Sequence, residues 1–384
     1  MDKREYFKAI KDVIYLAYCG VTERRADEAR VRNMDITAVY EAAKKHMLTA
    51  ICAMALESAG VRDKRFTQEM GKAIRKNVQM DIDRAQIFER FEAEKIWYMP
   101  LKGSLIKDLY PKYGMRQMSD NDILFDSTRA EDVRVIMESL GFTAEHFGHG
   151  NHDVYFKRPV SNFELHTGLF GASHDPVIYG YYKNIRSVLI KDEGNAYGYH
   201  FSPEDFYIYL TAHEYKHYSG GGTGLRSVLD TFVYLTKLGG SLDMEYIRGE
   251  CEKLGIAGFE AESRSLAMNL FGAKKLTEEN KKMLRYIVFS GTYGNIGNSV
   301  NNRVAKYGSG KLAKMKYTLG RLTVPISESS PGYSAMQSFY PWFYEKKYRI
   351  PLLFFYRLMR GLTVTRKKAV SELKVLLGNS QPEK

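Results

Sequence analysis

Ile96-Trp97-Tyr98-Met99-Pro100-Leu101 is a short apolar and aromatic run, and Lys102-Gly103-Ser104 follows it directly. The run predicts a strand, and Gly103 lets the backbone turn sharply into a helix from Ser104 to Tyr110. Helix N-termini attract phosphate through their free N–H groups. Further along, Asp120 and Asp122 open a second apolar strand, whose pleat puts both carboxylates on one face. The pattern predicts a phosphate turn beside two carboxylates that suit Mg²⁺.

The order of these elements resembles a known family. A strand, a Gly-Ser turn, a helix and an Asp-x-Asp strand are similar to the nucleotidyltransferase fold shared with polymerase-β-like enzymes. The chain most resembles a bacterial branch of uncharacterised nucleotidyltransferases, from about residue 102 to about residue 360. The motifs that carry this resemblance are Leu101-Lys102-Gly103, Tyr110-Pro111, Arg116, Ser119-Asp120-Asn121-Asp122, Phe163-Glu164-Leu165-His166, His213, Lys216, His217, Arg226, Asp230, Tyr340-Pro341-Trp342 and the helix Ile350 to Arg360.

The resemblance implies both a fold and a chemistry. The fold class is α+β, with a nucleotidyltransferase-type mixed β-sheet core and helical N-terminal and C-terminal regions. The reaction moves a nucleoside monophosphate, AMP from ATP, to a hydroxyl acceptor on a small molecule, a protein or an RNA end. CTP, GTP and UTP remain open as donors. Two Mg²⁺ ions would be held by Asp120, Asp122 and Glu164, which are the expected catalytic residues, and Glu164 could accept the proton of the attacking hydroxyl.

The same resemblance implies where the nucleotide binds. Ser104 and the N–H groups of the turn would hold the β and γ phosphates, while Lys102 or Arg116 would offset their charge. Two departures concern this region: the gap from Ser104 to Asp120 is long, and Glu164 stands where Asp is commoner. The expected nucleotide-binding residues are Lys102, Gly103, Ser104, Arg116, His213, Lys216, His217, Arg226 and Asp230.

A second motif supports a different function. His213-Glu214-Tyr215-Lys216-His217 satisfies the His-Glu-x-x-His pattern of zinc peptidases, in which two histidines on one helix face bind zinc and the glutamate acts as base. The third histidine of some peptidases is missing, because Gly221-Gly222-Thr223-Gly224 follows. Lys216 would also repel the cation. Histidines with ordinary hydrogen-bond partners on a half-buried helix are the structural alternative.

Length, cysteines and terminus limit the class of protein. A chain of 384 residues with a hydrophobic fraction of 44% is large enough for two or three folded units. Cys19, Cys52 and Cys251 are far apart and lack paired spacing, so they indicate neither a disulfide framework nor a zinc knuckle. The charged N-terminus has no apolar signal core, and no stretch approaches the length of a membrane-spanning helix. We expect a cytoplasmic protein without an integral membrane segment.

The positive charge is concentrated at the C-terminal end. From residue 301 onward, 16 Lys and Arg oppose four Glu, which equals the formal charge of +12 of the whole chain. Arg349 to Arg360 mixes bulky apolar residues with arginines, as interfacial helices do. Residues 301–384 could therefore contact RNA or another anionic surface. A non-catalytic RNA-binding or anionic-surface-binding protein stays an alternative, as does a tail helix packed on the body with a solvated basic face.

Helix and strand patterns divide the chain into four regions. Asp35 can cap a helix that runs through Met54 and ends at Gly60, and a long charged helix is expected from about Phe66 to Glu94. Strands are expected at Gly141–Thr143, Asp153–Lys157 and Asn162–His166, around a helix from Ala130 to Leu140. The expected units are a helical N-terminal region (1–95), a catalytic domain (96–201), a helical domain flanking the nucleotide cleft (202–305) and a basic tail with amphipathic helices (306–384).

Overall fold

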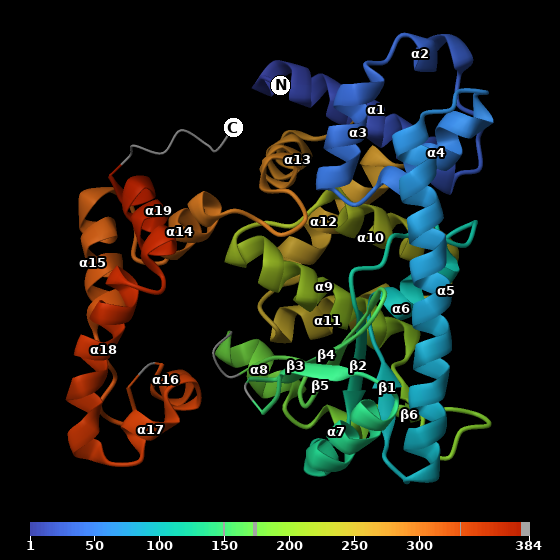
Figure 1. Cartoon of the computed structure of the whole chain (residues 1–384). Coiled ribbons are helices and arrows are strands. Elements are labelled where there is room, and N and C mark those ends of the chain that lie inside the picture. Colours follow the sequence, from blue (N-terminus) through green and yellow to red (C-terminus); the bar gives the residue numbers. More distant parts are fainter. Residues whose placement is uncertain (149, 172–174, 331, 378–384) are drawn as a thin grey trace.

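The structure is a computed structural model that describes residues 1–148, 150–171, 175–330 and 332–377. The other positions, which belong to the expected catalytic domain and the expected tail, lie outside the described residues: 149, 172–174, 331 and 378–384. Figure 1 shows a helical layer above a β-sheet, with a helical arm standing beside them. The chain thus has the expected α+β architecture, a mixed sheet with helical regions before and after it.

Five helices precede the sheet, and aspartates cap four of them. Asp2, Asp27, Asp35 and Asp63 each accept hydrogen bonds from backbone N–H groups of the first helical turn. The last helix, long and charged as expected, runs from this layer down along the sheet (Figure 1). The helices are α1 (Lys3–Val21), α2 (Glu28–Arg32), α3 (Ile36–Lys45), α4 (Thr49–Ser58) and α5 (Lys64–Ala93).

The single helix expected from Asp35 through Met54 is wrong, because the chain turns between α3 and α4. Met47 has a φ of 56°, and the N–H of Leu48 donates to the carbonyl of Ala43 at 2.9 Å. This closes α3 with a left-handed residue that is usually glycine. The turn also buries His46, whose ring contacts the Tyr6 hydroxyl and the N–H of Leu225. The turn between α3 and α4 is therefore accompanied by contacts of His46 with residues far away in the sequence. The helical periodicity of the sequence did not indicate this turn.

The sheet has five strands in the order β1-β2-β5-β4-β3, all antiparallel except the parallel pair β2 and β5. The helix expected from Ser104 to Tyr110 is shorter than predicted and continues as a 3₁₀ turn at Lys107–Leu109. The elements of this unit are β1 (Tyr98–Pro100), α6 (Gly103–Ile106), β2 (Asn121–Phe125), α7 (Ala130–Ser139), β3 (Thr143–His146), β4 (His152–Lys157) and β5 (Ser161–His166).

The two faces of the sheet differ in chemistry because side chains alternate along each strand. Ile123, Phe163 and Leu165 point to one face and pack with Ile87 of α5 and Val133 of α7 in a hydrophobic cluster. The intervening positions on β2 and β5 carry acids and a histidine. The polar face therefore lies opposite a hydrophobic core.

The chain after the sheet is again helical and shares a core with the N-terminal helices. One hydrophobic cluster contains Ile10 of α1, Ile51 of α4, Tyr209 of α9 and Leu229 of α10. The N-terminal region and the later helices are thus packed together. The elements are α8 (Pro176–Tyr182), β6 (Ile190–Lys191), β7 (Tyr199–His200), α9 (Pro203–Gly220), α10 (Leu225–Leu238), α11 (Met244–Lys253), α12 (Ala257–Leu270) and α13 (Glu278–Ser290).

The C-terminal helices form an arm that reaches the body through α14 (Figure 1). Asn302 of α14 donates to the carbonyl of Ser219 at the end of α9 at 3.0 Å. No helix among the described residues is long and apolar enough to cross a bilayer. The elements are α14 (Ile296–Ala305), α15 (Gly310–Leu322), α16 (Tyr333–Phe339), α17 (Pro341–Tyr344), α18 (Ile350–Leu362) and α19 (Arg366–Leu376).

Candidate active site

Asp122 and Glu164 lie side by side on the polar face of the sheet. They are register partners on the parallel strands β2 and β5. His166, two residues along β5, presents its ring to the same place, and one ligand atom from each of the three lies within 4.8 Å of the others. The Asp122 and His166 side chains are each only 4% exposed, whereas that of Glu164 is 25% exposed. Glu164 is therefore the member that faces solvent.

Lys102 neutralises Asp122. Its Nζ lies 2.6 Å from Asp122 Oδ1, and His166 Nε2 lies 2.8 Å from the same oxygen. Burial alone would raise the pKa of Asp122, but the Lys102 ammonium and the hydrogen bond from His166 hold that pKa well below its usual range. Burial lowers the pKa of His166 to about 4, so the ring is neutral at pH 7. Asp122 is thus a fixed anion with two donors on one oxygen.

The backbone at Lys102 is strained. The residue has φ 49° and ψ −120°, a backbone conformation that residues other than glycine rarely adopt. Such strain costs of order 1–3 kcal/mol and is characteristic of functional sites. This backbone conformation lies at the start of α6, where the Lys102 ammonium donates a hydrogen bond to the Asp122 carboxylate.

The carboxylates crowd one another. Burial, followed by the negative charges of Asp122 and Asp120, raises the pKa of Glu164 to about 7. Burial and Asp122 likewise raise the pKa of Asp120, which lies immediately before β2. Carboxylate oxygens are the ligands that Mg²⁺ prefers, and a cation would relieve the repulsion between these acids. The ligand atoms of Asp122, Glu164 and His166 are therefore close enough together to hold a metal ion, and the negative charge of Asp120 also acts on this group.

The turn that follows β1 is closely packed. A Cβ atom at position 103 would overlap Nη1 of Arg116 and lie 3.0 Å from its Cζ, so Gly103 provides space for the guanidinium. The Ser104 hydroxyl is buried and donates to the carbonyl of Leu101 at 2.7 Å. In this structure the Ser104 hydroxyl stabilises the turn itself.

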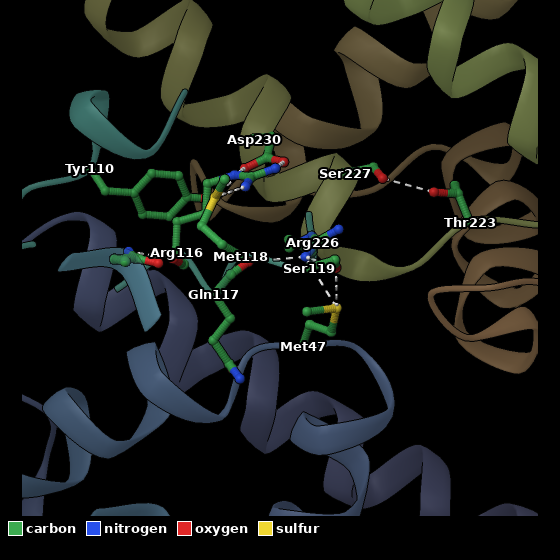
Figure 2. A network of polar contacts seen from close by, with 11 residues as sticks. Met47, Tyr110, Arg116, Gln117, Met118, Ser119, Thr223, Arg226, Ser227 and Asp230 are labelled. Atoms are coloured by element: carbon green, nitrogen blue, oxygen red, sulfur yellow. Dashed lines mark hydrogen bonds and ion pairs between the residues drawn. The ribbon is translucent and has the colours of Figure 1, made fainter. Parts of the chain in front are cut away.

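Arg116 is bound to Asp230 of α10 by a buried ion pair with two hydrogen bonds (Figure 2). Nε and Nη2 each donate to a carboxylate oxygen at 2.8 Å, and the Tyr110 hydroxyl donates to Oδ1 at the same distance. Although burial opposes the charge, Asp230 keeps the pKa of Arg116 above its usual value. Arg116 and Asp230 thus form an ion pair with each other. This pair links the segment after α6 to α10.

Arg226 contacts the segment just before the aspartates (Figure 2). Its Nη1 donates to the Gln117 carbonyl at 3.0 Å and to the Ser119 hydroxyl at 3.3 Å. Lys76 of α5 donates to the Ser119 carbonyl at 2.6 Å. Lys76 was absent from the sequence-based site, because nothing in a long charged helix marks one of its lysines. Both cations position the backbone that leads into Asp120.

Helix α9 faces the polar side of the sheet with a row of polar groups. His213 is close enough to Lys102 for that ammonium to add to burial in lowering the pKa of the ring well below its usual value. Burial and Lys102 also lower the pKa of Lys216 to about 8, although Glu164 and Asp122 attract its charge. Among the described residues Lys216 has no carboxylate partner within ion-pair distance. The structure therefore brings Lys216 and His213 to the acidic site.

The zinc-peptidase motif lacks the required geometry. His213 and His217 do share a face of α9, with their Nε2 atoms 3.2 Å apart. Glu214, however, is buried and accepts a hydrogen bond from Ser263 of α12 at 3.2 Å, so it does not face a metal between the histidines. Across the described parts of the chain, the only cluster of three or more potential metal ligands is Asp122, Glu164 and His166.

Two histidines beside Glu164 were not assigned roles from the sequence. His166 Nε2 lies 3.7 Å and His152 Nε2 3.9 Å from Glu164 Oε2. The alternation of β5 does place His166 on the face of Glu164, so that signal was available. His152 lies opposite His166 because β4 pairs with β5. The residue pattern of a single strand cannot predict this pairing.

Comparison with known proteins identifies a family. A family model described as uncharacterised nucleotidyltransferase matches residues 32–272, which include the whole site and exclude the arm. No curated protein and no solved structure matches the chain significantly.

Proposed function

The chain belongs to the family of uncharacterised nucleotidyltransferases, and from this premise we propose that it transfers AMP from ATP to a hydroxyl acceptor at the Asp120, Asp122 and Glu164 site. The acceptor oxygen would bond to the α-phosphorus as pyrophosphate leaves. The acceptor would be a hydroxyl of a small molecule, a protein or an RNA end. One observation carries the proposal: Asp122 and Glu164 are register partners on adjacent parallel strands, directly beside the Lys102–Gly103 turn.

The triphosphate would lie between this turn and α9. Lys216 supports that placement, because its ammonium faces the acids and has no carboxylate within ion-pair distance among the described residues. His213 lines the same side. The Lys102 ammonium already interacts with Asp122. When the triphosphate binds, the positive charge of Lys102 would act on both the carboxylate and the phosphate. Together these groups would orient the nucleotide and offset the charge on its phosphates.

Asp120, Asp122 and Glu164 would hold two Mg²⁺ ions. When bound, Mg²⁺ offsets phosphate charge and makes the acceptor hydroxyl easier to deprotonate. Glu164 is the best-placed proton acceptor, because it is the more exposed of the two paired acids. His166 and Lys102 keep Asp122 fixed and ionised, so it does not compete for this proton.

Titration calorimetry with non-hydrolysable analogues of the four nucleoside triphosphates, with and without Mg²⁺, tests the nucleotide site before the acceptor is known. We expect Mg²⁺-dependent binding of the ATP analogue, weakened about tenfold or more in Asp120→Asn through the lost charge. Asp126→Asn is a matched control on the same segment, because Asp126 only caps the turn at Ser127–Arg129. It should bind as the wild type does.

The outcomes are distinct. Binding of a different nucleotide would support the proposed transferase activity but would change the identity of the donor nucleotide. No binding of any nucleotide, or equal binding by Asp120→Asn, would contradict the proposed site.

A further inference from the structure

The arm exposes apolar stripes on three helices. On α18, Leu352, Phe355, Met359 and Leu362 recur at helical spacing and are 51%, 63%, 58% and 62% exposed. The opposite side of α18, with Leu353, is buried against the arm's own helices. One face of α18 therefore holds the arm together while the other is left uncovered.

The neighbouring helices repeat this arrangement. On α15, Leu312, Met315 and Leu319 are each more than half exposed at the same spacing. On α19, exposed side chains recur in the same way at Val370, Leu373 and Leu377, the last just beyond the helix end. Apolar residues scattered singly on a surface need no explanation, but rows of them on adjacent helices indicate a contact surface.

The same helices are rich in basic residues. Residues 310–377 contain 13 Lys and Arg but only three Glu. Of the two arginines in ion pairs, Arg321 contacts Glu372 and Arg349 contacts Glu345. The remaining exposed cations have no carboxylate partner within the described part of the arm: Lys311, Lys316, Lys346, Lys347, Arg360, Arg366, Lys367, Lys368 and Lys374.

We propose that the arm docks in the plane of an anionic lipid bilayer, with the apolar stripes in the interface and the basic side chains on the headgroups. Helices with apolar rows and Lys/Arg-rich flanks bind membrane surfaces in this way. A second copy of the chain is a poor occupant, because two strongly basic arms repel each other. RNA would use the charges but leave the rows of Leu, Met and Val uncovered.

Flotation of the full-length protein with phosphatidylcholine vesicles, with and without phosphatidylglycerol, tests this surface. We expect partition onto the anionic vesicles, reduced about tenfold or more in the triple variant Leu352→Gln, Phe355→Gln and Met359→Gln. These side chains are exposed, so the fold should survive, which circular dichroism checks. The matched control replaces three exposed apolar residues of the body, Ile82→Gln, Val135→Gln and Val177→Gln, and should bind vesicles normally.

A second variant separates the contribution of the basic side chains to vesicle binding from that of the apolar stripes. Neutralising Arg360, Arg366, Lys367 and Lys368 to Gln should remove the preference for phosphatidylglycerol and the salt dependence. Unchanged partition of the stripe variant, or no partition of the wild type, would overturn the proposal. So would binding of single-stranded RNA that persists in the stripe variant without vesicle binding, or a concentration-dependent dimer that the stripe variant loses. The vesicle assay contains no nucleotide, so its result is independent of the proposed transferase function.

Discussion

Replacing Asp230 by Ala tests whether the buried pair with Arg116 stabilises the protein. Asp230 accepts two hydrogen bonds from Arg116 and one from the Tyr110 hydroxyl, all at 2.8 Å, and the Arg116 side chain is only 7% exposed. The substitution leaves a guanidinium buried without its counter-ion, which typically costs about 3–5 kcal/mol. The lost partner of Tyr110 adds about 1 kcal/mol. We therefore expect the free energy of unfolding to fall by at least about 3 kcal/mol.

Urea denaturation followed by circular dichroism measures this loss, and a double-mutant cycle assigns it. Arg116→Met removes the charge but keeps a long side chain, so combining it with Asp230→Ala removes the unpaired partner as well. The double variant should be less destabilised than the sum of the single variants, by about 2 kcal/mol. Asp132→Ala breaks an exposed Arg–Asp pair of α7 with Arg129 and is the control, with an expected loss below about 1 kcal/mol.

Additive losses in this cycle would refute the reasoning, because the two side chains would then not depend on each other. Nucleotide titration of Arg116→Met gives a separate answer. If Arg116 also contacts a phosphate, the variant loses nucleotide affinity while it is still folded. If the residue only anchors the turn, affinity falls only as the protein unfolds.

Two further predictions concern buried charge and backbone strain. Burial raises the pKa of Glu214 to about 7, above its unfolded value of 4.5, so the folded state keeps this proton longer and stability should fall as the pH rises from about 4.5 to about 7. Glu214→Gln should remove up to about 3 kcal/mol of that fall, and equal pH dependence of unfolding in variant and wild type would contradict it. Lys102→Gly should be more stable than Lys102→Met by about 1–2 kcal/mol in the same urea assay, because both lose the ammonium but only glycine relieves the positive φ. The reverse order would show an unstrained turn.

Local patterns predicted the long helix before the sheet and most strands of the sheet. The strands at β1, β2, β4 and β5 and the helices α5 and α7 lie within a few residues of the predicted positions, because each has clear periodicity or punctuation. The break at Met47 was missed, since an apolar row continues across it and methionine is an unusual residue for a left-handed turn. Its burial of His46 depends on α10, far away in the sequence.

The site shows the same limit of local reasoning. The alternation of β2 and β5 predicts which face each acid takes, but the pairing of Asp122 with Glu164 needs the strand order. Arg116 and Asp230 were expected at the nucleotide, which stays a prediction, and the structure shows that they also form an ion pair with each other. Residue type alone does not reveal whether a cation faces a ligand or a buried carboxylate.

Gly103 is the first residue of α6, and the space that it leaves is filled by the Arg116 guanidinium. The left-handed conformation in this turn belongs instead to Lys102. Among related chains, positions 103 and 116 should therefore change together, with alanine at the first accompanied by a smaller side chain at the second. Aligned relatives that keep the glycine after losing the arginine would be released from this steric constraint, and in them the turn would be free to accept a larger residue at position 103.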